Sequence, residues 1–138
     1  MQRYEQIPHT ADLAARIYGR TPEELFENAA FAMFDMAADL SGIEADLAVE
    51  IDLEAGDREA LLVSWLNELL YRAFAEGSVF NEFKVIFPED NRLKAEARGL
   101  RLFGNTGRMY KEIKAATYHD LEIRKAGRGY EVTVVFDV

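Results

Sequence analysis

Residues 21–40 read TPEELFENAAFAMFDMAADL and form the clearest helix signal in the chain. Thr21 is a candidate N-cap, Pro22 would occupy the first helical position, and Glu24 is placed to complete a capping box. Apolar residues then recur every three or four positions, which predicts an amphipathic helix with one face on a core. These residues are Leu25, Phe26, Ala29, Ala30, Met33, Phe34, Ala37 and Leu40. The Ser-Gly dipeptide that follows is expected to end the helix.

A second amphipathic helix is expected to start near Asp57 and to run to Gly77. One face of this helix would carry the apolar residues Leu62, Trp65, Leu66, Leu69 and Ala73. The two helices therefore predict a core that both of them cover.

The segments around the helices alternate between apolar and polar residues, as half-buried strands do. In residues 45–54, ADLAVEIDLE, the apolar side chains share one face and the carboxylates share the other. We interpret those carboxylates as solvated, although a metal cluster is the alternative. Further strands are expected at residues 13–18, 79–87, 92–102, 113–124 and 129–137.

Two local features refine the expected strands. The apolar positions of the strand from Arg92 change parity near Gly99, which suggests a bulge there. The sequence KAGRG at residues 125–129 predicts a hairpin between the last two strands. The order of strand, helix, strand, helix and four strands predicts an α+β fold, in which two amphipathic helices pack on a largely antiparallel β-sheet. We expect residues 1–138 to form one domain.

Composition and charge limit the classes of function. The chain has 49% hydrophobic and 30% charged residues, which suits a packed core with a solvated surface. It has no cysteine, so a thiolate nucleophile and a cysteine-based metal site are excluded. The formal net charge of −9 argues against strong direct binding of nucleic acid. No signal peptide or membrane-spanning stretch is visible, and we expect a cytoplasmic protein without a membrane partner.

Recognisable catalytic motifs are few. Neither histidine has a serine or cysteine at a nucleophile spacing, and no glycine-rich phosphate loop is present. The chemistry-bearing stretches are IPHTAD at residues 7–12, EIKAATYHDLEI at residues 112–123 and the final FDV. Alternation along the expected strand puts His119 on its apolar side, where a structural histidine is commoner than a ligand. From these residues alone, Asp12 is read as the cap of a turn.

Taken together, these stretches make the chain resemble the archease family, small proteins that assist the RNA-splicing ligase that joins tRNA halves. The resemblance also includes TPEELFENAAFAMF at residues 21–34 and WLNELLY at residues 65–71, so it covers the whole chain. It implies an archease-like domain that is not itself an enzyme. Such a protein would help the ligase to acquire guanylate from GTP and to turn over repeatedly, and could broaden the ligase's use of nucleotides.

The resemblance also implies a divalent metal site at Asp12, Asp137 and Val138, the last through its α-carboxylate. Hard cations prefer oxygen ligands, so Ca²⁺ is our first expectation, with Mg²⁺ or Mn²⁺ as alternatives. His9 would then orient a ligand, or it would close the turn by hydrogen bonding. Candidates for the surface that contacts the ligase are Lys114, Tyr118 and His119. This site requires the first expected strand, at residues 13–18, to lie beside the last one.

Two other functions remain open at this point. A stand-alone metal-dependent phosphoesterase or nuclease could use Asp12, Asp137 and His119, although no basic substrate-binding stripe accompanies them. A broader chaperone of RNA-modifying enzymes could dock through its helix surfaces or through residues 79–87, VFNEFKVIF.

Overall fold

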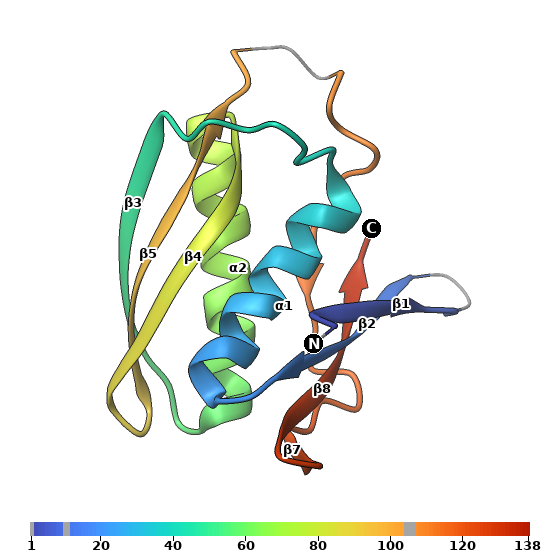
Figure 1. Cartoon of the computed structure of the whole chain (residues 1–138), viewed down its shortest axis with the longest axis vertical. Coiled ribbons are helices and arrows are strands. Elements are labelled where there is room, and N and C mark those ends of the chain that lie inside the picture. Colours follow the sequence, from blue (N-terminus) through green and yellow to red (C-terminus); the bar gives the residue numbers. More distant parts are fainter. Residues whose placement is uncertain (1, 10–11, 104–106) are drawn as a thin grey trace.

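The computed structural model describes residues 2–9, 12–103 and 107–138. Two antiparallel sheets stand on either side of a layer of two helices (Figure 1). The elements in chain order are β1 (Tyr4–Ile7), β2 (Leu13–Gly19), α1 (Pro22–Ala37), β3 (Leu47–Glu54), α2 (Arg58–Glu76), β4 (Ser78–Glu89), β5 (Arg92–Arg101), β6 (Ala115–Ala116), β7 (Arg124–Ala126) and β8 (Gly129–Asp137). The α+β class is confirmed, although the strands form two sheets instead of one. No helix in the described part of the chain is long and apolar enough to span a bilayer.

Helix α1 begins as the sequence predicts. The Thr21 hydroxyl accepts a hydrogen bond from the Glu24 N–H at 3.1 Å, and the Glu24 carboxylate accepts one from the Arg20 N–H at 3.2 Å. The helix ends at Ala37, earlier than expected, because the Ala37 carbonyl accepts hydrogen bonds from the N–H groups of the segment at Tyr110. That tertiary contact replaces the next helical turn.

Helix α2 also has the predicted limits. The Asp57 carboxylate accepts a hydrogen bond from the Ala60 N–H at 2.7 Å, and Gly77 ends the helix in the left-handed conformation, with φ of 60°. Trp65 is completely buried, and its indole N–H donates to the Phe26 carbonyl at 3.0 Å. This bond joins α2 to α1 inside the core. It also gives the indole N–H the hydrogen-bond acceptor that a buried donor needs.

The three-stranded sheet has the order β3-β5-β4. A bulge does occur opposite Gly99, but it lies on the neighbouring strand: β5 stays in register with β3, and the extra residue is Asn81 on β4. A Cβ atom at Gly99 would lie 1.9 Å from the Val79 carbonyl oxygen. The glycine therefore marks a close approach of two backbones, which a single sequence does not distinguish from a bulge.

The five-stranded sheet has the order β1-β2-β8-β6, and β7 also pairs with β8. The continuous strand expected at residues 113–124 is wrong, since only Ala115 and Ala116 pair with β8 before the chain leaves the sheet. It turns at Asp120, which has φ of 48°, and rejoins the sheet at β7. The predicted hairpin between β7 and β8 is confirmed. Strand β1 was not predicted, because four residues are too few to show a period.

The side chain of Glu27 on α1 gives a prediction about pH. Its carboxylate accepts a hydrogen bond from the Val85 N–H at 2.9 Å, yet burial raises its pKa despite that bond. The folded protein therefore binds this proton more tightly than the unfolded chain does. Protonated Glu27 contributes its full stability below the unfolded pKa, and this contribution is lost as the pH rises through the folded pKa. We therefore expect Glu27→Gln, which keeps an acceptor, to have the higher free energy of unfolding at about pH 7, with the difference closing near pH 4.

Urea unfolding of both proteins at the two pH values measures this difference. Glu44→Gln is the matched control, because Glu44 is exposed. A Glu27→Gln protein that is equally or less stable near neutral pH would contradict the expectation.

Candidate functional site

The pairing of β2 with β8 brings the two predicted aspartates to one end of the sheet. Leu13 pairs with Phe136 in this antiparallel ladder. Asp12 immediately precedes Leu13 and Asp137 immediately follows Phe136, so the two aspartates occupy neighbouring positions across the ladder. The site required the first expected strand to lie beside the last one, and the structure meets this requirement.

Asp137 is held from its other side as well. It pairs with Ala115 of β6, and its carbonyl accepts a hydrogen bond from the Lys114 N–H at 2.8 Å. The side chains of Asp137 and Val138 remain exposed. The backbone of this end of β8 is thus fixed by strands on both sides while its carboxylate stays accessible to solvent.

The two histidines lie together beside Asp12. His9 Nδ1 is 3.6 Å from the Asp12 carboxylate, and the rings of His9 and His119 meet edge to face with centroids 5.8 Å apart. His119 Nε2 lies 3.4 Å from the Asp120 carboxylate. The expected place of His119 on an apolar strand face is wrong: its side chain is 58% exposed, because the chain has left the sheet before this residue.

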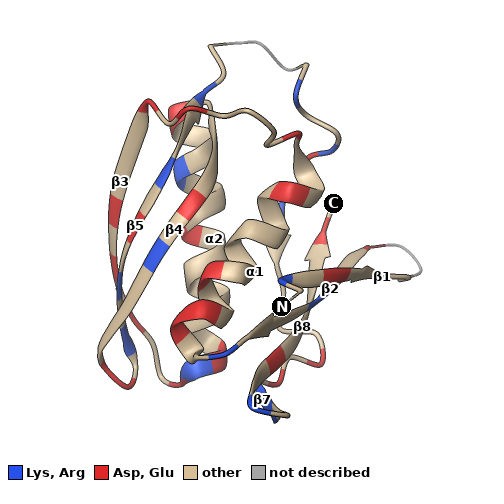
Figure 2. Cartoon of the chain, viewed as in Figure 1, with Lys and Arg blue, Asp and Glu red and all other residues tan. Residues whose placement is uncertain are grey.

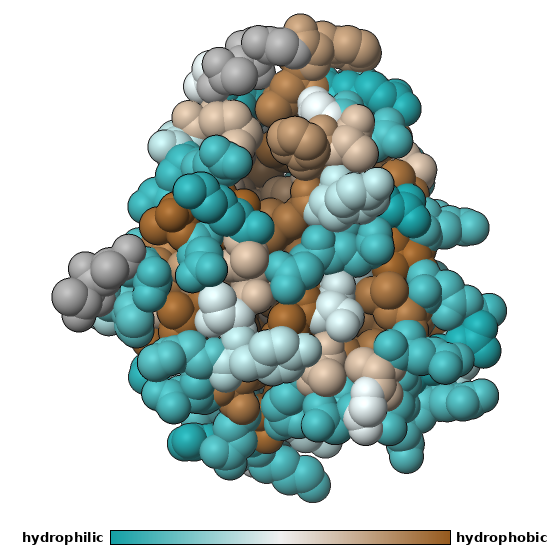
Figure 3. Space-filling model, turned by 180° about the vertical axis from the view of Figure 1, so that it is seen from behind, coloured by the Kyte–Doolittle hydropathy of each residue, from teal (hydrophilic) through white to brown (hydrophobic). Residues whose placement is uncertain are grey.

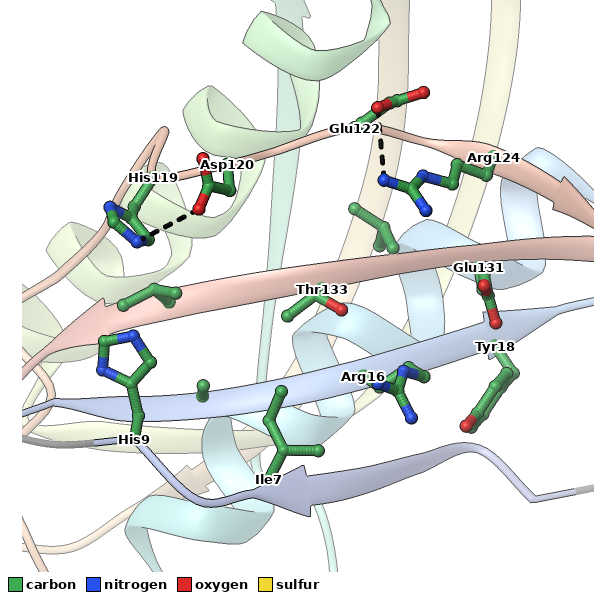
Figure 4. A pocket seen from close by; sticks show the side chains of 13 residues that line it. Ile7, His9, Arg16, Tyr18, His119, Asp120, Glu122, Arg124, Glu131 and Thr133 are labelled. Atoms are coloured by element: carbon green, nitrogen blue, oxygen red, sulfur yellow. Dashed lines mark hydrogen bonds and ion pairs between the residues drawn. The ribbon is translucent and has the colours of Figure 1, made fainter.

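A polar groove of about 470 Å³ runs from this histidine pair over the outer face of the sheet (Figure 4). Its floor consists of β2 and β8, and the segment from His119 to Arg124 forms one wall. Arg16 forms an ion pair with Glu5 at 2.8 Å, and the Tyr18 hydroxyl donates to the same carboxylate at 2.9 Å. The Arg16 guanidinium on the groove floor is therefore paired with a carboxylate from β1.

The remaining two candidates lie on the surface next to this end of the sheet. Lys114 directly precedes β6 and is exposed, and Tyr118 lies in the segment that leads to His119, with 60% of its side chain exposed. All of the predicted residues thus fall at the end of β8 or directly after it, on the chain just before β2, or on the neighbouring segment that includes β6. They are His9, Asp12, Lys114, Tyr118, His119, Asp137 and Val138.

The sequence of the chain matches the Archease protein family (MTH1598/TM1083) over residues 4–138. The chain belongs to the archease family. It is 43% identical to Protein archease from Methanosarcina barkeri, with 99% of this chain and 97% of that protein covered. It is 40% identical to Protein archease from Pyrococcus furiosus, with 94% of this chain and 93% of that protein covered. The predicted family membership is therefore confirmed.

Solved structures agree with this assignment. The solution structure of Methanobacterium thermoautotrophicum protein 1598 superposes with a TM-score of 0.84 at 33% identity and covers all of both chains. The crystal structure of an archease, possible chaperone, from Thermotoga maritima gives a TM-score of 0.66 at 29% identity, over 97% of this chain and 96% of that one. The α+β fold is thus the fold of solved archease structures.

The donor set at the end of β8 suits the cation that archease resemblance implies. Two aspartate side chains and the α-carboxylate of Val138 are all oxygen donors, and the Asp12 side chain is 35% exposed, so solvent can complete a coordination shell. No group of three histidine, aspartate or glutamate side chains suited to a metal occurs among residues 2–9, 12–103 and 107–138. A cation site at this end of the sheet would therefore need a donor besides those side chains, and the resemblance implies the α-carboxylate of Val138 in that role.

Sequence reasoning missed the residues that form the charged part of the groove. Glu5 belongs to the unpredicted strand β1, and its carboxylate contacts Arg16 and Tyr18 of β2. The alternation of β2 puts Arg16 and Tyr18 on its outer face, and this signal could have identified them. Burial and the hydrogen bond to Glu5 raise the pKa of Tyr18.

Proposed function

We propose that this archease is a non-catalytic activator of the RNA-splicing ligase in tRNA splicing. It would act in the cytoplasm, promoting guanylylation of the ligase and its multiple turnover. The observation that carries the proposal is the register of β2 and β8, which sets Asp12 beside Asp137. Family membership supports a role of this kind, and the Thermotoga maritima relative is described as a possible chaperone, which supports action on a protein partner.

A divalent cation is part of the proposal. Asp12, Asp137 and the α-carboxylate of Val138 would hold Ca²⁺, with Mg²⁺ or Mn²⁺ as substitutes. The bound cation would supply positive charge that attracts and polarises phosphate oxygens. His9 Nδ1, at 3.6 Å from the Asp12 carboxylate, would restrict the orientation of that ligand. Lys114, Tyr118 and His119 would belong to the surrounding contact surface.

Charge distribution supports a protein partner more than direct binding of RNA. Figure 2 shows acidic segments on both helices and on β3, and acidic residues interleaved with basic ones along β4 and β5. Arg16 and Arg124 in the groove already contact Glu5 and Glu122. Unpaired cations drive the binding of phosphates, so the described surface favours a partner that brings its own basic residues.

Multiple-turnover RNA ligation with limiting ligase tests the proposal. We expect the wild-type chain to raise the number of turnovers, and we expect Asp12→Ala and a form lacking Asp137 and Val138 to lose this stimulation. Asp120→Asn is the matched control, because the Asp120 side chain is 93% exposed and lies beside His119 instead of Asp137. Circular dichroism of each variant checks that it keeps the secondary-structure content of wild type.

Three results would contradict the proposal. Equal stimulation by wild type and Asp12→Ala would remove the carboxylate site from the function. Hydrolysis of RNA or phosphoesters by the pure chain with Mn²⁺, in the absence of any ligase, would favour the phosphoesterase or nuclease instead. A pull-down that returns many unrelated RNA-modifying enzymes without enrichment of the ligase would favour the broader chaperone.

A further inference from the structure

An apolar cleft of about 780 Å³ opens on the face opposite to that of Figure 1. We call it the α2 cleft, because the last turns of α2 form one wall; the end of α1, the start of β4 and residues 109–115 complete it. Figure 3 shows it as a hollow between hydrophobic residues. Met33, Phe34 and Val79 line the cleft and are buried in the core.

Large apolar side chains at the rim of the α2 cleft are exposed to solvent. Phe74 is 86% exposed, Tyr71 is 65% exposed and Met109 is 37% exposed. A group of this kind is uncommon on a monomeric surface and marks an interaction site. Aromatic residues and methionine are also the types enriched at the centres of protein interfaces.

A buried polar group lines the same cleft. Ser78, the first residue of β4, is 6% exposed, and its hydroxyl has no hydrogen-bond partner among the described atoms. Leaving a buried hydroxyl unpaired is unfavourable. The hydroxyl oxygen is also shielded from solvent, so Ser78 belongs to the buried floor of the cleft and not to its contact surface.

The spacing of the wall residues indicates what shape of occupant fits. Asn67, Leu70, Tyr71 and Phe74 line the cleft at positions i, i+3, i+4 and i+7 of α2. Such a row forms a ridge and groove on the helix surface, and the complementary surface is that of another helix. An amphipathic helix from a partner docks in this way by placing apolar side chains at the same spacing.

The far wall of the α2 cleft leads directly to the carboxylate site. Ala115 lines the cleft and pairs with Asp137, and the Lys114 N–H donates to the Asp137 carbonyl. The Asn67 side chain of α2 bonds both the N–H and the carbonyl of Ala116, at 2.8 and 3.2 Å. The cleft and the carboxylate site thus share one short segment, so a single partner can contact both.

We propose that the α2 cleft receives an amphipathic helix of the same protein partner that the carboxylate site serves. This inference rests on the proposed function, since it takes the RNA-splicing ligase as that partner. The apolar side chains of the incoming helix would cover Tyr71 and Phe74 and enter the cleft between α2 and residues 109–115.

Titration of the ligase against archease variants by biolayer interferometry tests the proposal. We expect Phe74→Glu to weaken binding at least about tenfold, because it puts a charge against the apolar occupant. Ile86→Glu is the matched control, because Ile86 is 51% exposed on β4 and lies outside the cleft. The affinity of this variant for the ligase should stay within about twofold of that of wild type. The Ca²⁺ affinity of both variants should equal that of wild type.

The outcomes separate the two proposals. Equal ligase affinity for wild type and Phe74→Glu overturns the cleft proposal and leaves the proposed function standing. A wild-type chain that does not bind the ligase overturns both. The cleft proposal also fails if Phe74→Glu leaves the ligase affinity unchanged and has a different effect. Sedimentation would then show a loss of self-association, or native mass spectrometry would show the release of a bound small molecule.

Discussion

Replacing Asp12 with asparagine is expected to lower the affinity for Ca²⁺ by at least about tenfold. Asparagine keeps the size of the side chain and one oxygen but removes the negative charge, which is what a hard cation prefers in a ligand. Ca²⁺ should also raise the unfolding temperature of wild type, since a ligand of the folded state stabilises it, and this shift should shrink in the variant. Isothermal titration calorimetry and thermal unfolding with and without Ca²⁺ measure both effects.

Two further variants test whether the loss of Ca²⁺ affinity is specific to the proposed ligands. Asp120→Asn removes a carboxylate that contacts His119 at 3.4 Å but leaves the end of β8 unchanged, and its Ca²⁺ affinity should equal that of wild type. Adding a glycine after Val138 moves the α-carboxylate away and should weaken binding as Asp12→Asn does. If Asp12→Asn bound Ca²⁺ as tightly as wild type, Asp12 would not be a ligand. If the chain with the added glycine bound Ca²⁺ as tightly as wild type, the α-carboxylate would not be a ligand.

Trp65→Ala is expected to lower the free energy of unfolding by about 3–5 kcal/mol. Trp65 is completely buried, its indole donates to the Phe26 carbonyl, and its ring meets that of Phe83 edge to face with centroids 6.2 Å apart. Removing it leaves a cavity between both helices and β4, which the surrounding core fills only in part. Denaturant unfolding followed by far-UV circular dichroism measures the loss.

Trp65→Phe separates packing from hydrogen bonding, because it keeps an aromatic ring but loses the indole N–H. We expect it to cost less than Trp65→Ala but more than Tyr118→Ala, since Tyr118 is 60% exposed. A loss of under about 1 kcal/mol in Trp65→Ala would show that the two helices do not depend on this contact for their stability.

The helices were the part of the fold best predicted from the sequence. Thr21 and Asp57 satisfy N–H groups of the following turn, so each helix start depends on residues that are neighbours in the chain. The end of α1 was misplaced because the groups that replace its next turn come from the segment at Tyr110. Local signals thus set three of the four helix limits, and a distant segment sets the fourth.

Strand prediction failed where an apolar pattern continues beyond the sheet. Residues 113–124 alternate as a strand does, but the chain turns at Asp120 and most of this segment lies outside the sheet. Ile113 and Ala116 are nevertheless buried. Alternation therefore predicted neither the pairing nor the burial of this segment correctly: Ala116 is on the expected polar side yet is buried, and His119 is on the expected apolar side yet is exposed. Pairing depends on which neighbours the rest of the fold supplies.

The candidate site was predicted by resemblance and not by spacing along the chain. Asp12 and Asp137 are separated by most of the sequence, and only the pairing of β2 with β8 makes them neighbours. No local pattern reports a contact of that range. The juxtaposition of His9 with His119 escaped prediction for the same reason, as did the contact of Glu5 with Arg16. The metal assignment and the ligase partner remain predictions.

The central place of β8 in its sheet affects how the protein folds during translation. β2 pairs with β1 on one side, but its other edge stays open until residues 129–137 have been made. At typical elongation rates the ribosome needs on the order of ten seconds to add the intervening residues. During that time the nascent hairpin presents an unprotected edge to other chains. The same late strand closes this edge and brings Asp137 beside Asp12, so a nascent chain has the aspartate pair only after it has closed that edge.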